Sequence, residues 1–153
     1  MNFELAFSAA SLLAMAGWLV LLASPLIPIW SDRIAGLLIP MLLSVGYFAL
    51  LVFKSTSGDG GFSSLTDVMK LFSHQQSVLA AWVHFLALDL LIGAWACRVT
   101  RRERLNFWLV VPCLFLTFMF GPVGFLAFSG LRFFSRASGQ FHLGATTRGK
   151  THK

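Results

Sequence analysis

Four long stretches without acidic or basic residues limit what this chain can fold into. They cover residues 5–31, 34–53, 78–97 and 105–131, and Asp89 alone interrupts one of them. A helix rising about 1.5 Å per residue needs about 20 residues to cross a hydrocarbon core of about 30 Å, and each stretch is long enough. Because lipid offers no hydrogen-bond partners to the backbone, these stretches predict transmembrane helices.

Composition and charge agree with a membrane protein. Of the 153 residues, 57% are hydrophobic and 12% are charged, whereas a soluble domain carries about 25% charged residues. The net charge of +6 comes from basic residues that flank the apolar stretches, at 98–104 and after Leu131. Anionic lipid headgroups explain such positions more simply than nucleic acid does, and no nucleic-acid recognition motif accompanies them. We therefore predict membrane lipid as a partner and no nucleic-acid binding.

The four stretches predict an all-α, integral membrane four-helix bundle of up-down topology, with both termini on the same side. The predicted helices form a domain over residues 1–131 and cover about 3–24, 34–53, 78–97 and 106–131. Pro40 predicts a kink in the second helix. Residues 132–153 form a basic tail, and we expect its last ten residues to be disordered.

The side of the membrane on which each end lies is left open by the basic residues. In the four-helix arrangement, seven lysines and arginines lie on the side of the termini and five on the other side, which is too even a division for the positive-inside rule. The first stretch lacks the basic segment of a signal peptide and is too long for its apolar part, so we interpret it as a retained helix. We expect the protein in a bacterial inner (plasma) membrane.

Residues 65–73 carry a shorter apolar pattern at helical spacing, in which Ser64 can cap the helix and Asp67 suits its first turn. An amphipathic helix on the membrane surface and an ordinary surface turn both fit this pattern. In the first predicted helix, alanines and a glycine form a small-residue stripe that favours close approach of a neighbouring helix. Its members are Ala6, Ala10, Ala14 and Gly17.

The two cysteines, Cys97 and Cys113, fall inside or at the edge of apolar stretches. Their separation matches no metal-ligand spacing. We predict buried, unreactive thiols, no metal site and no cofactor.

Two titratable side chains, His84 and Asp89, lie within the third predicted helix. Ionising either group in lipid costs several kcal/mol, so an intramembrane carboxyl group suggests a functional site. The two residues are separated by about 7.5 Å along the axis and by about 140° around it. They are therefore not a pair on one helix, and each is expected to find partners on other helices. Interhelix hydrogen bonds with a structural role are the alternative.

Depth matching in an up-down bundle suggests those partners. Residues equally far from their helix midpoints share a membrane level, which places Asp89 with Ser44 and Thr117, and His84 with Tyr47 and residues 121–124. Pro122 lacks an N–H and loosens the fourth helix, while the flanking glycines allow close approach. The candidate catalytic residues are His84 and Asp89, and the candidate ligand-binding residues are Trp82, Tyr47, Thr117, Gly121, Pro122 and Gly124.

The stretch "AAWVHFLALDLLIGAW", then Pro112, then "LTFMFGPVGFLAF" resemble the small four-helix membrane family that includes the plant abscisic-acid-deficient type 4 proteins. Those proteins are required for making neoxanthin from violaxanthin, and the resemblance implies a carotenoid-linked role. The chemistry it implies is opening of a 5,6-epoxide and loss of a ring-adjacent proton to give an allene, without net redox. Such a step needs an acid and a base, and His84 and Asp89 occupy the matching positions.

These observations lead to two main hypotheses. In the first, the chain is a multi-pass membrane protein that binds a carotenoid or other isoprenoid, and it is either a binding protein or a cofactor-independent isomerase that uses His84 and Asp89. In the second, it is a non-enzymatic membrane assembly or stabilising subunit in which the same residues form interhelix hydrogen bonds. A transporter agrees less well with the sequence, because one carboxyl group supplies no relay and no pair of broken helices is visible.

Overall fold

The computed structural model describes residues 2–53 and 60–147, with side chains described as far as Arg136. Every regular element in these residues is a helix, which confirms the all-α class. Three helices are long and apolar enough to cross a membrane: Phe3–Leu22, Pro28–Val52 and Gln75–Arg102. The chain divides into two compact units, residues 1–95 and 96–153, which are described separately.

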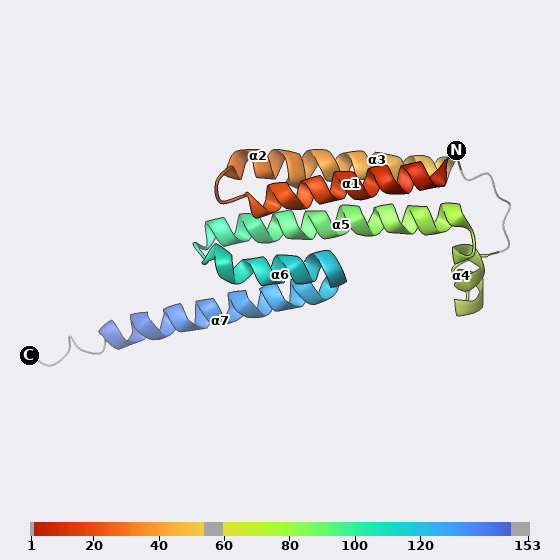
Figure 1. Cartoon of the computed structure of the whole chain (residues 1–153). Helices are drawn as coiled ribbons and strands as arrows, with labels where there is room; N and C mark the ends of the chain where they lie inside the picture. The colour runs from red at the N-terminus through yellow and green to blue at the C-terminus, as the bar shows by residue number, and fades with distance from the viewer. Residues whose placement is uncertain (1, 54–59, 148–153) are drawn as a thin grey trace, which may run out of the picture. The chain divides into compact units, whose positions relative to one another are not determined.

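The first span is α1 (Phe3–Leu22), and the second is a continuous run of α2 (Pro28–Arg33), η1 (Ile34–Leu38) and α3 (Ile39–Val52) (Figure 1). η1 is a π-helical turn in which the N–H of Ile39 bonds to the carbonyl of Ile34. Pro40, the second residue of α3, explains this wider turn. Its ring would press on the carbonyl four residues earlier in a regular α-helix, and it has no N–H to donate. The irregularity predicted at Pro40 is thus a π turn.

The third span, α5 (Gln75–Arg102), extends beyond both ends of the predicted helix at 78–97. Before it lies α4 (Leu65–Phe72), so the amphipathic segment is a helix and not an ordinary turn. The Ser64 hydroxyl oxygen accepts a hydrogen bond from the Asp67 N–H at 3.1 Å, and the hydroxyl donates to the Asp67 carboxylate at 2.8 Å. This cap starts α4 where the sequence predicted it. Residues 54–59, part of the predicted loop, lie outside the described residues.

Within residues 1–95, α1 packs closely on its neighbours through small residues. A Cβ at Gly17 would lie 2.6 Å from Leu90 Cδ2 and 3.3 Å from Ile39 Cδ1. A Cβ at Gly93 would likewise lie 2.9 Å from Leu21 Cδ1. The helices can approach this closely only because both positions lack a side chain. The predicted small-residue stripe contributes through Ala14 and Gly17, which are buried, and through Ala6 and Ala10, which are half-buried.

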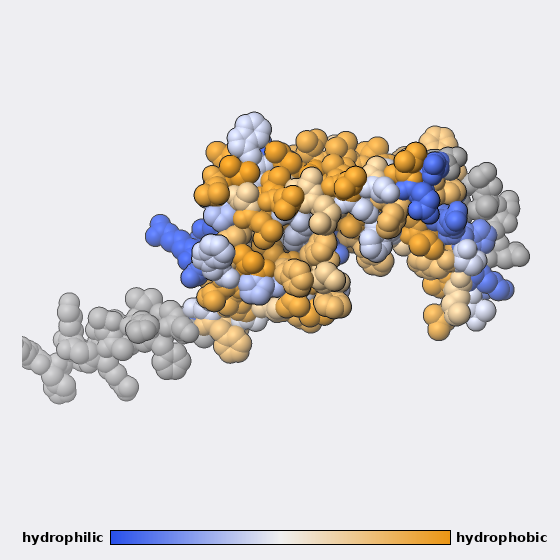
Figure 2. All heavy atoms as spheres, in the orientation of Figure 1, coloured by the Kyte–Doolittle hydropathy of each residue, from blue (hydrophilic) through white to orange (hydrophobic). Residues whose placement is uncertain are grey.

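The outward faces of the spans are apolar. Leu12 is 71% exposed, Val45 61% and Phe48 64%, and Figure 2 shows hydrophobic residues over the helical surface. Contiguous exposed apolar surface of this kind marks contact with lipid or with another apolar partner. Together with the length of the three spans, it supports an integral membrane protein.

The predicted fourth helix over 106–131 is wrong. The structure instead has α6 (Phe107–Phe120) and α7 (Pro122–Thr147), which run side by side as a hairpin (Figure 1). Gly121 lies between them with a φ of 40°, a conformation that favours glycine. The predicted four-helix up-down bundle is therefore not confirmed. The physical reason is that Gly121 can turn the chain where a helix would have had to continue.

Two further predictions concern the end of the chain. α7 continues as a helix through Thr147, so no boundary falls at the predicted start of the tail, between 131 and 132. Residues 148–153, most of the segment expected to be disordered, lie outside the described residues. Cys97 and Cys113 are both buried free thiols, as predicted.

Candidate functional site

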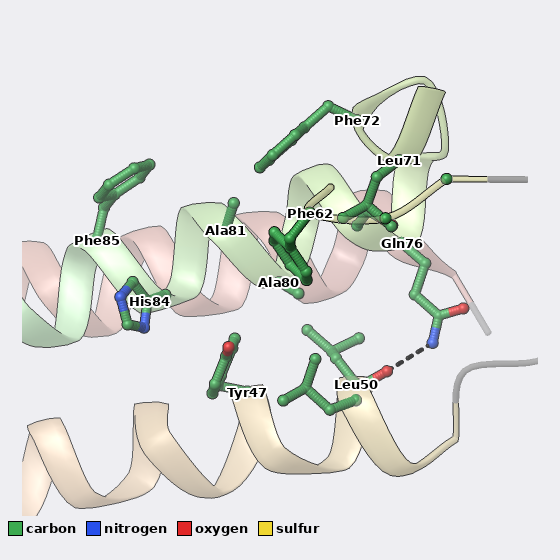
Figure 3. A pocket seen from close by; sticks show the side chains of 14 residues that line it. Tyr47, Leu50, Phe62, Leu71, Phe72, Gln76, Ala80, Ala81, His84 and Phe85 are labelled. Carbon is green, nitrogen blue, oxygen red and sulfur yellow. Dashed lines mark hydrogen bonds between the residues drawn. The ribbon is translucent and has the colours of Figure 1, made fainter. Parts of the chain in front are cut away.

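A cavity of about 590 Å³ lies among α3, α4, the start of α5 and residues 60–62 (Figure 3). Its wall is mostly aliphatic and aromatic. The lining residues are Tyr47, Leu50 and Leu51 of α3, Gly60, Gly61 and Phe62, Leu71 and Phe72 of α4, and Gln76, Ser77, Ala80, Ala81, His84 and Phe85 of α5. All of them belong to the unit over residues 1–95.

One face of α5 forms the floor of the cavity. Gln76, Ala80 and His84 follow each other at intervals of four residues, so their side chains stand on the same side of the helix. Ala80 and Ala81 carry only methyl groups, which leaves the hollow between α5 and α3. Phe62 lies near this face in Figure 3. The cavity thus exists because two small residues, Ala80 on this face and Ala81 on the adjoining face, occupy this part of α5.

Tyr47 and His84 face each other across the space between α3 and α5 (Figure 3). Their ring centroids are 5.3 Å apart and the planes are inclined by 44°. Depth matching predicted that these two residues share a level, and the structure brings them together. Within the described residues neither side chain forms a hydrogen bond, so the phenol hydroxyl and the imidazole nitrogens are available to a ligand.

Gln76 holds the outer end of the cavity, and sequence reasoning missed it. Its side-chain amide donates to the carbonyl of Leu50 at 2.8 Å and to that of Phe53 at 3.3 Å. These carbonyls lie in the last turn of α3, where no further backbone N–H is available to them. The bonds therefore join the start of α5 to the end of α3. The position of Gln76, eight residues before His84 on the same face, was the signal that could have identified it.

Asp89 is half-buried on α5 and does not line the cavity. No hydrogen bond or ion pair of its carboxyl group is seen within the described residues. Ser44, predicted at the same depth, is exposed. The structure thus agrees with the helical geometry in keeping His84 and Asp89 apart, and it places only His84 at the cavity.

Trp82 also lies away from the Tyr47–His84 cavity. Its indole N–H donates to the Ser11 hydroxyl at 3.1 Å, and its ring lies 5.4 Å from that of Phe7. It lines a separate hollow of about 230 Å³ beside the first turns of α1. Its observed contacts therefore join α5 to α1.

The remaining predicted ligand-binding residues lie in the α6–α7 hairpin, within residues 96–153. Thr117 is buried and its hydroxyl donates to the Cys113 carbonyl at 2.8 Å. Gly124 is in contact with Thr117, because an added Cβ would overlap the Thr117 backbone and hydroxyl group. Gly121 and Pro122 form the turn itself. These observed contacts build the hairpin.

The cavity has the chemistry of a site for a mainly apolar ligand. Its polar groups are the Tyr47 hydroxyl, the His84 imidazole, the Gln76 amide and the Ser77 hydroxyl. A few polar groups in an apolar wall fix the orientation of such a ligand, and an imidazole can also accept or donate a proton. Within the described residues no three histidine, cysteine, aspartate or glutamate side chains are grouped to hold a metal ion.

Comparison with known protein families gives a match over most of the chain. The ABA4-like family, described as ABA DEFICIENT 4-like, matches residues 5–128. No protein of curated function and no solved structure matches the chain. The matched segment includes most of α1, the second span, α5, α6 and the start of α7, and it covers well over half of the 153 residues. This chain, with three helices long and apolar enough to cross a membrane, therefore belongs to the ABA4-like family.

Proposed function

We propose that this membrane protein binds a carotenoid or another isoprenoid with an oxygen-bearing end, and that the end group lies in the Tyr47–His84 cavity. The observation that carries the proposal is a polar pair, with rings 5.3 Å apart, in a mostly apolar cavity. Its volume of about 590 Å³ lies within the range of about 300–1,000 Å³ that is usual for small-molecule sites.

The cavity suits one end of a long molecule better than a whole one. Phe62 is 85% exposed and Phe85 is 60% exposed, so the wall does not close around its contents. A cyclic end group fits between Tyr47 and His84, while an apolar chain passes Phe85 and continues into lipid. Membrane lipid is thus the medium from which the ligand enters.

If the protein also acts on its ligand, the reaction is an isomerisation without net redox. A proton goes to the epoxide oxygen as the ring C–O bond breaks, and a ring-adjacent carbon loses a proton as a new double bond forms. We assign one proton transfer to His84. We assign the second to Asp89, which lies outside the cavity, so the reacting end group would reach it only by moving along α5 past Phe85.

Filling the cavity tests binding directly. Ala81→Phe places a ring in the hollow, whereas Ala16→Phe makes the same change at an exposed position of α1. The full chain is purified in detergent with an epoxide-bearing carotenoid, and retained pigment is measured by its visible absorbance per protein. We expect at least a tenfold loss for Ala81→Phe and none for Ala16→Phe. Equal retention by both variants would contradict the site.

The polar pair has its own test. Tyr47→Phe removes only a hydroxyl group, and we expect it to weaken binding of an oxygen-bearing carotenoid by about fivefold, since a hydrogen bond contributes about 1 kcal/mol. Binding of a hydrocarbon carotenoid serves as the control and stays unchanged. For catalysis, product formation measured by chromatography is expected to disappear in His84→Ala. Persistence of turnover in that variant would remove His84 from the mechanism.

Asp89 favours a second candidate, a membrane assembly or stabilising subunit. A half-buried carboxyl group without a partner in the described residues suits a hydrogen bond to another membrane protein. Asp89→Asn is then expected to retain the assembly and Asp89→Leu to lose it, as measured by co-purification from membranes. Loss of carotenoid turnover in Asp89→Asn, with assembly intact, supports the enzymatic role instead. For localisation we propose a bacterial inner membrane, which membrane fractionation tests.

A further inference from the structure

We infer that the chain crosses the bilayer three times, that α6 and α7 form a re-entrant hairpin, and that the arginine-rich end of α5 is cytoplasmic. The Tyr47–His84 cavity then lies in the half of the bilayer that faces away from the cytoplasm. Only the use of this cavity by a ligand rests on the proposed function. The topology itself rests on helix lengths, hydrogen bonds and charge.

The hairpin is too short to cross the membrane. α6 has 14 residues, which corresponds to about 21 Å, less than the hydrocarbon core of about 30 Å. The apolar part of α7 ends before Arg132, within ten residues of its start at Pro122. Each arm therefore reaches into the bilayer without passing through it.

Gly121, the non-helical residue between the two helices of the hairpin, has both of its backbone groups hydrogen-bonded. The Gly121 N–H donates to the Thr117 carbonyl at 2.8 Å, and the Gly121 carbonyl accepts from the Phe125 N–H at 3.3 Å. Gly121 and Gly124 are buried. Non-helical backbone is tolerated inside a membrane only where it is buried and bonded in this way.

An ionic contact shows where the hairpin returns. Glu103, which follows the last residue of α5, binds Arg132 Nε at 2.7 Å and Arg136 Nη2 at 2.5 Å. Both arginines lie on α7, ten or more residues beyond the turn. The described end of α7 is therefore on the same side of the membrane as the α5–α6 connection. In a four-span bundle these residues would lie on opposite sides.

Because α7 returns to the side of the α5–α6 connection, the basic residues divide less evenly between the two sides of the membrane than in a four-span bundle. Among the described residues, seven arginines lie on the side of the α5–α6 connection: Arg33, Arg98, Arg101, Arg102, Arg104, Arg132 and Arg136. Lys70 is the one described lysine or arginine on the other side, and Lys54 follows α3 in the sequence. In the four-span arrangement, the division of seven basic residues on one side and five on the other was too even for the positive-inside rule. In the three-span arrangement the rule assigns the arginine-rich side to the cytoplasm.

The cavity lies at the opposite end of α5. Its α5 residues lie between Gln76 and Phe85, in the first part of a helix that ends at Arg102. Gln76 bonds to the last turn of α3, so both spans begin or end at this level. An isoprenoid would therefore enter from the outer leaflet.

Cysteine labelling tests the topology without any ligand. In a background with Cys97 and Cys113 replaced by alanine, single cysteines are introduced as Ser63→Cys, Arg102→Cys or Phe133→Cys, all at exposed positions. Intact spheroplasts are treated with a membrane-impermeant maleimide, and permeabilised ones serve as the reference. We expect labelling of Ser63→Cys in intact cells, and labelling of the other two only after permeabilisation.

Any other labelling pattern of the three cysteine variants contradicts the number of spans, the orientation or both. Labelling of Phe133→Cys together with Ser63→Cys would restore the four-span bundle. Labelling of Arg102→Cys but not of Ser63→Cys would reverse the orientation. Should the cysteine variants fail to insert, a green fluorescent reporter joined to either terminus of the otherwise unchanged chain tests the same topology, which requires the C-terminus to be cytoplasmic and the N-terminus to lie on the other side. Fluorescence agrees with a cytoplasmic end, and its absence from full-length fusion protein in the membrane contradicts it.

Sidedness of ligand entry is then measured separately. A carotenoid offered from one leaflet of oriented proteoliposomes should bind fastest from the face on which Ser63→Cys is labelled, with the ratio of rates as the readout. Failure to bind from either face counts against the proposed function and leaves the labelling result standing. Faster binding from the arginine-rich face would overturn the leaflet assignment alone.

Discussion

Two apolar stretches of this chain each contain a proline, and they fold differently. Around Pro40 the helix continues, with one π turn in η1, and α2 to α3 remain a single span from Pro28 to Val52. Around Pro122 the helix stops, and the chain turns back on itself. The presence of proline in an apolar stretch therefore does not decide whether a membrane helix continues.

The residue before each proline explains the difference. Ile39 precedes Pro40, and a β-branched residue with positive φ is strongly disfavoured. Gly121 precedes Pro122 and adopts a φ of 40°, which costs glycine little. Gly124 then lets α7 approach Thr117 closely enough to pack against α6. The break thus depends on glycines, with proline as a convenient first residue of the new helix.

The largest loss of stability is expected from adding a methyl group where the two helices of the hairpin touch, at Gly124. In Gly124→Ala the new Cβ would overlap the backbone nitrogen, Cα and hydroxyl oxygen of Thr117. Backbone atoms cannot move aside cheaply, so we expect a loss of about 3 kcal/mol, measured by thermal unfolding in detergent. Gly130→Ala, in the same helix but with open space around its Cβ, should be neutral or stabilising by up to about 1 kcal/mol. Similar losses in both would disprove the contact.

The next largest loss of stability is expected at Gly121, in the turn between α6 and α7. Gly121→Ala forces a Cβ into a left-handed conformation, and we expect a cost of about 2 kcal/mol. Gly46→Ala is the matched change in α3, where nothing lies within 4 Å of the new Cβ, and it should not destabilise. If Gly121→Ala is as stable as Gly46→Ala, the chain at 121 can continue as a helix and the comparison with Pro40 fails.

A smaller and pH-dependent effect is expected at the hairpin's ionic contact. Hydrogen bonding to Arg132, more than that to Arg136, lowers the pKa of Glu103 from 4.5 to about 2. A carboxyl group with a lowered pKa contributes stability that is complete above its ordinary pKa and is lost as the pH falls toward the lowered value. The melting temperature of the native chain should therefore fall more steeply from about pH 4.5 to pH 2 than that of Glu103→Gln. Glu4→Gln, at an exposed position of α1, should follow the native profile.

The smallest effect is expected from the prolines themselves. Pro40→Ala restores a backbone N–H to a turn that is already wide enough, and Pro122→Ala changes a first-turn position whose N–H has no helical partner in any case. We expect each to change stability by less than about 1 kcal/mol in the same detergent assay. A loss of several kcal/mol in Pro122→Ala, with Gly121→Ala neutral, would transfer the cause of the break from glycine to proline.

Much of the helical framework could be predicted from local sequence. The observed α1 and α3 lie within the helices predicted from the charge-free stretches and α4 starts at the Ser64 cap, while α5 contains its predicted helix and extends beyond both ends of it, since helix length and capping depend on neighbouring residues. Part of the site could be predicted as well, because Tyr47 and His84 share a depth in antiparallel spans and lie together. Gln76 was missed because its partners, the carbonyls at the end of α3, are distant in sequence.

By itself, the sequence determined that this chain is helical and has the character of a membrane protein, because uncharged stretches of about 20 residues match the length of a membrane-spanning helix. It also determined that His84 and Asp89 point to different sides of one helix, since that follows from helical geometry alone. The tertiary structure decided that residues 106–131 form a hairpin and that Glu103 binds Arg132 and Arg136. A Gly–Pro pair can bend a helix or end it, and contacts between residues far apart in the chain determine which of the two occurs.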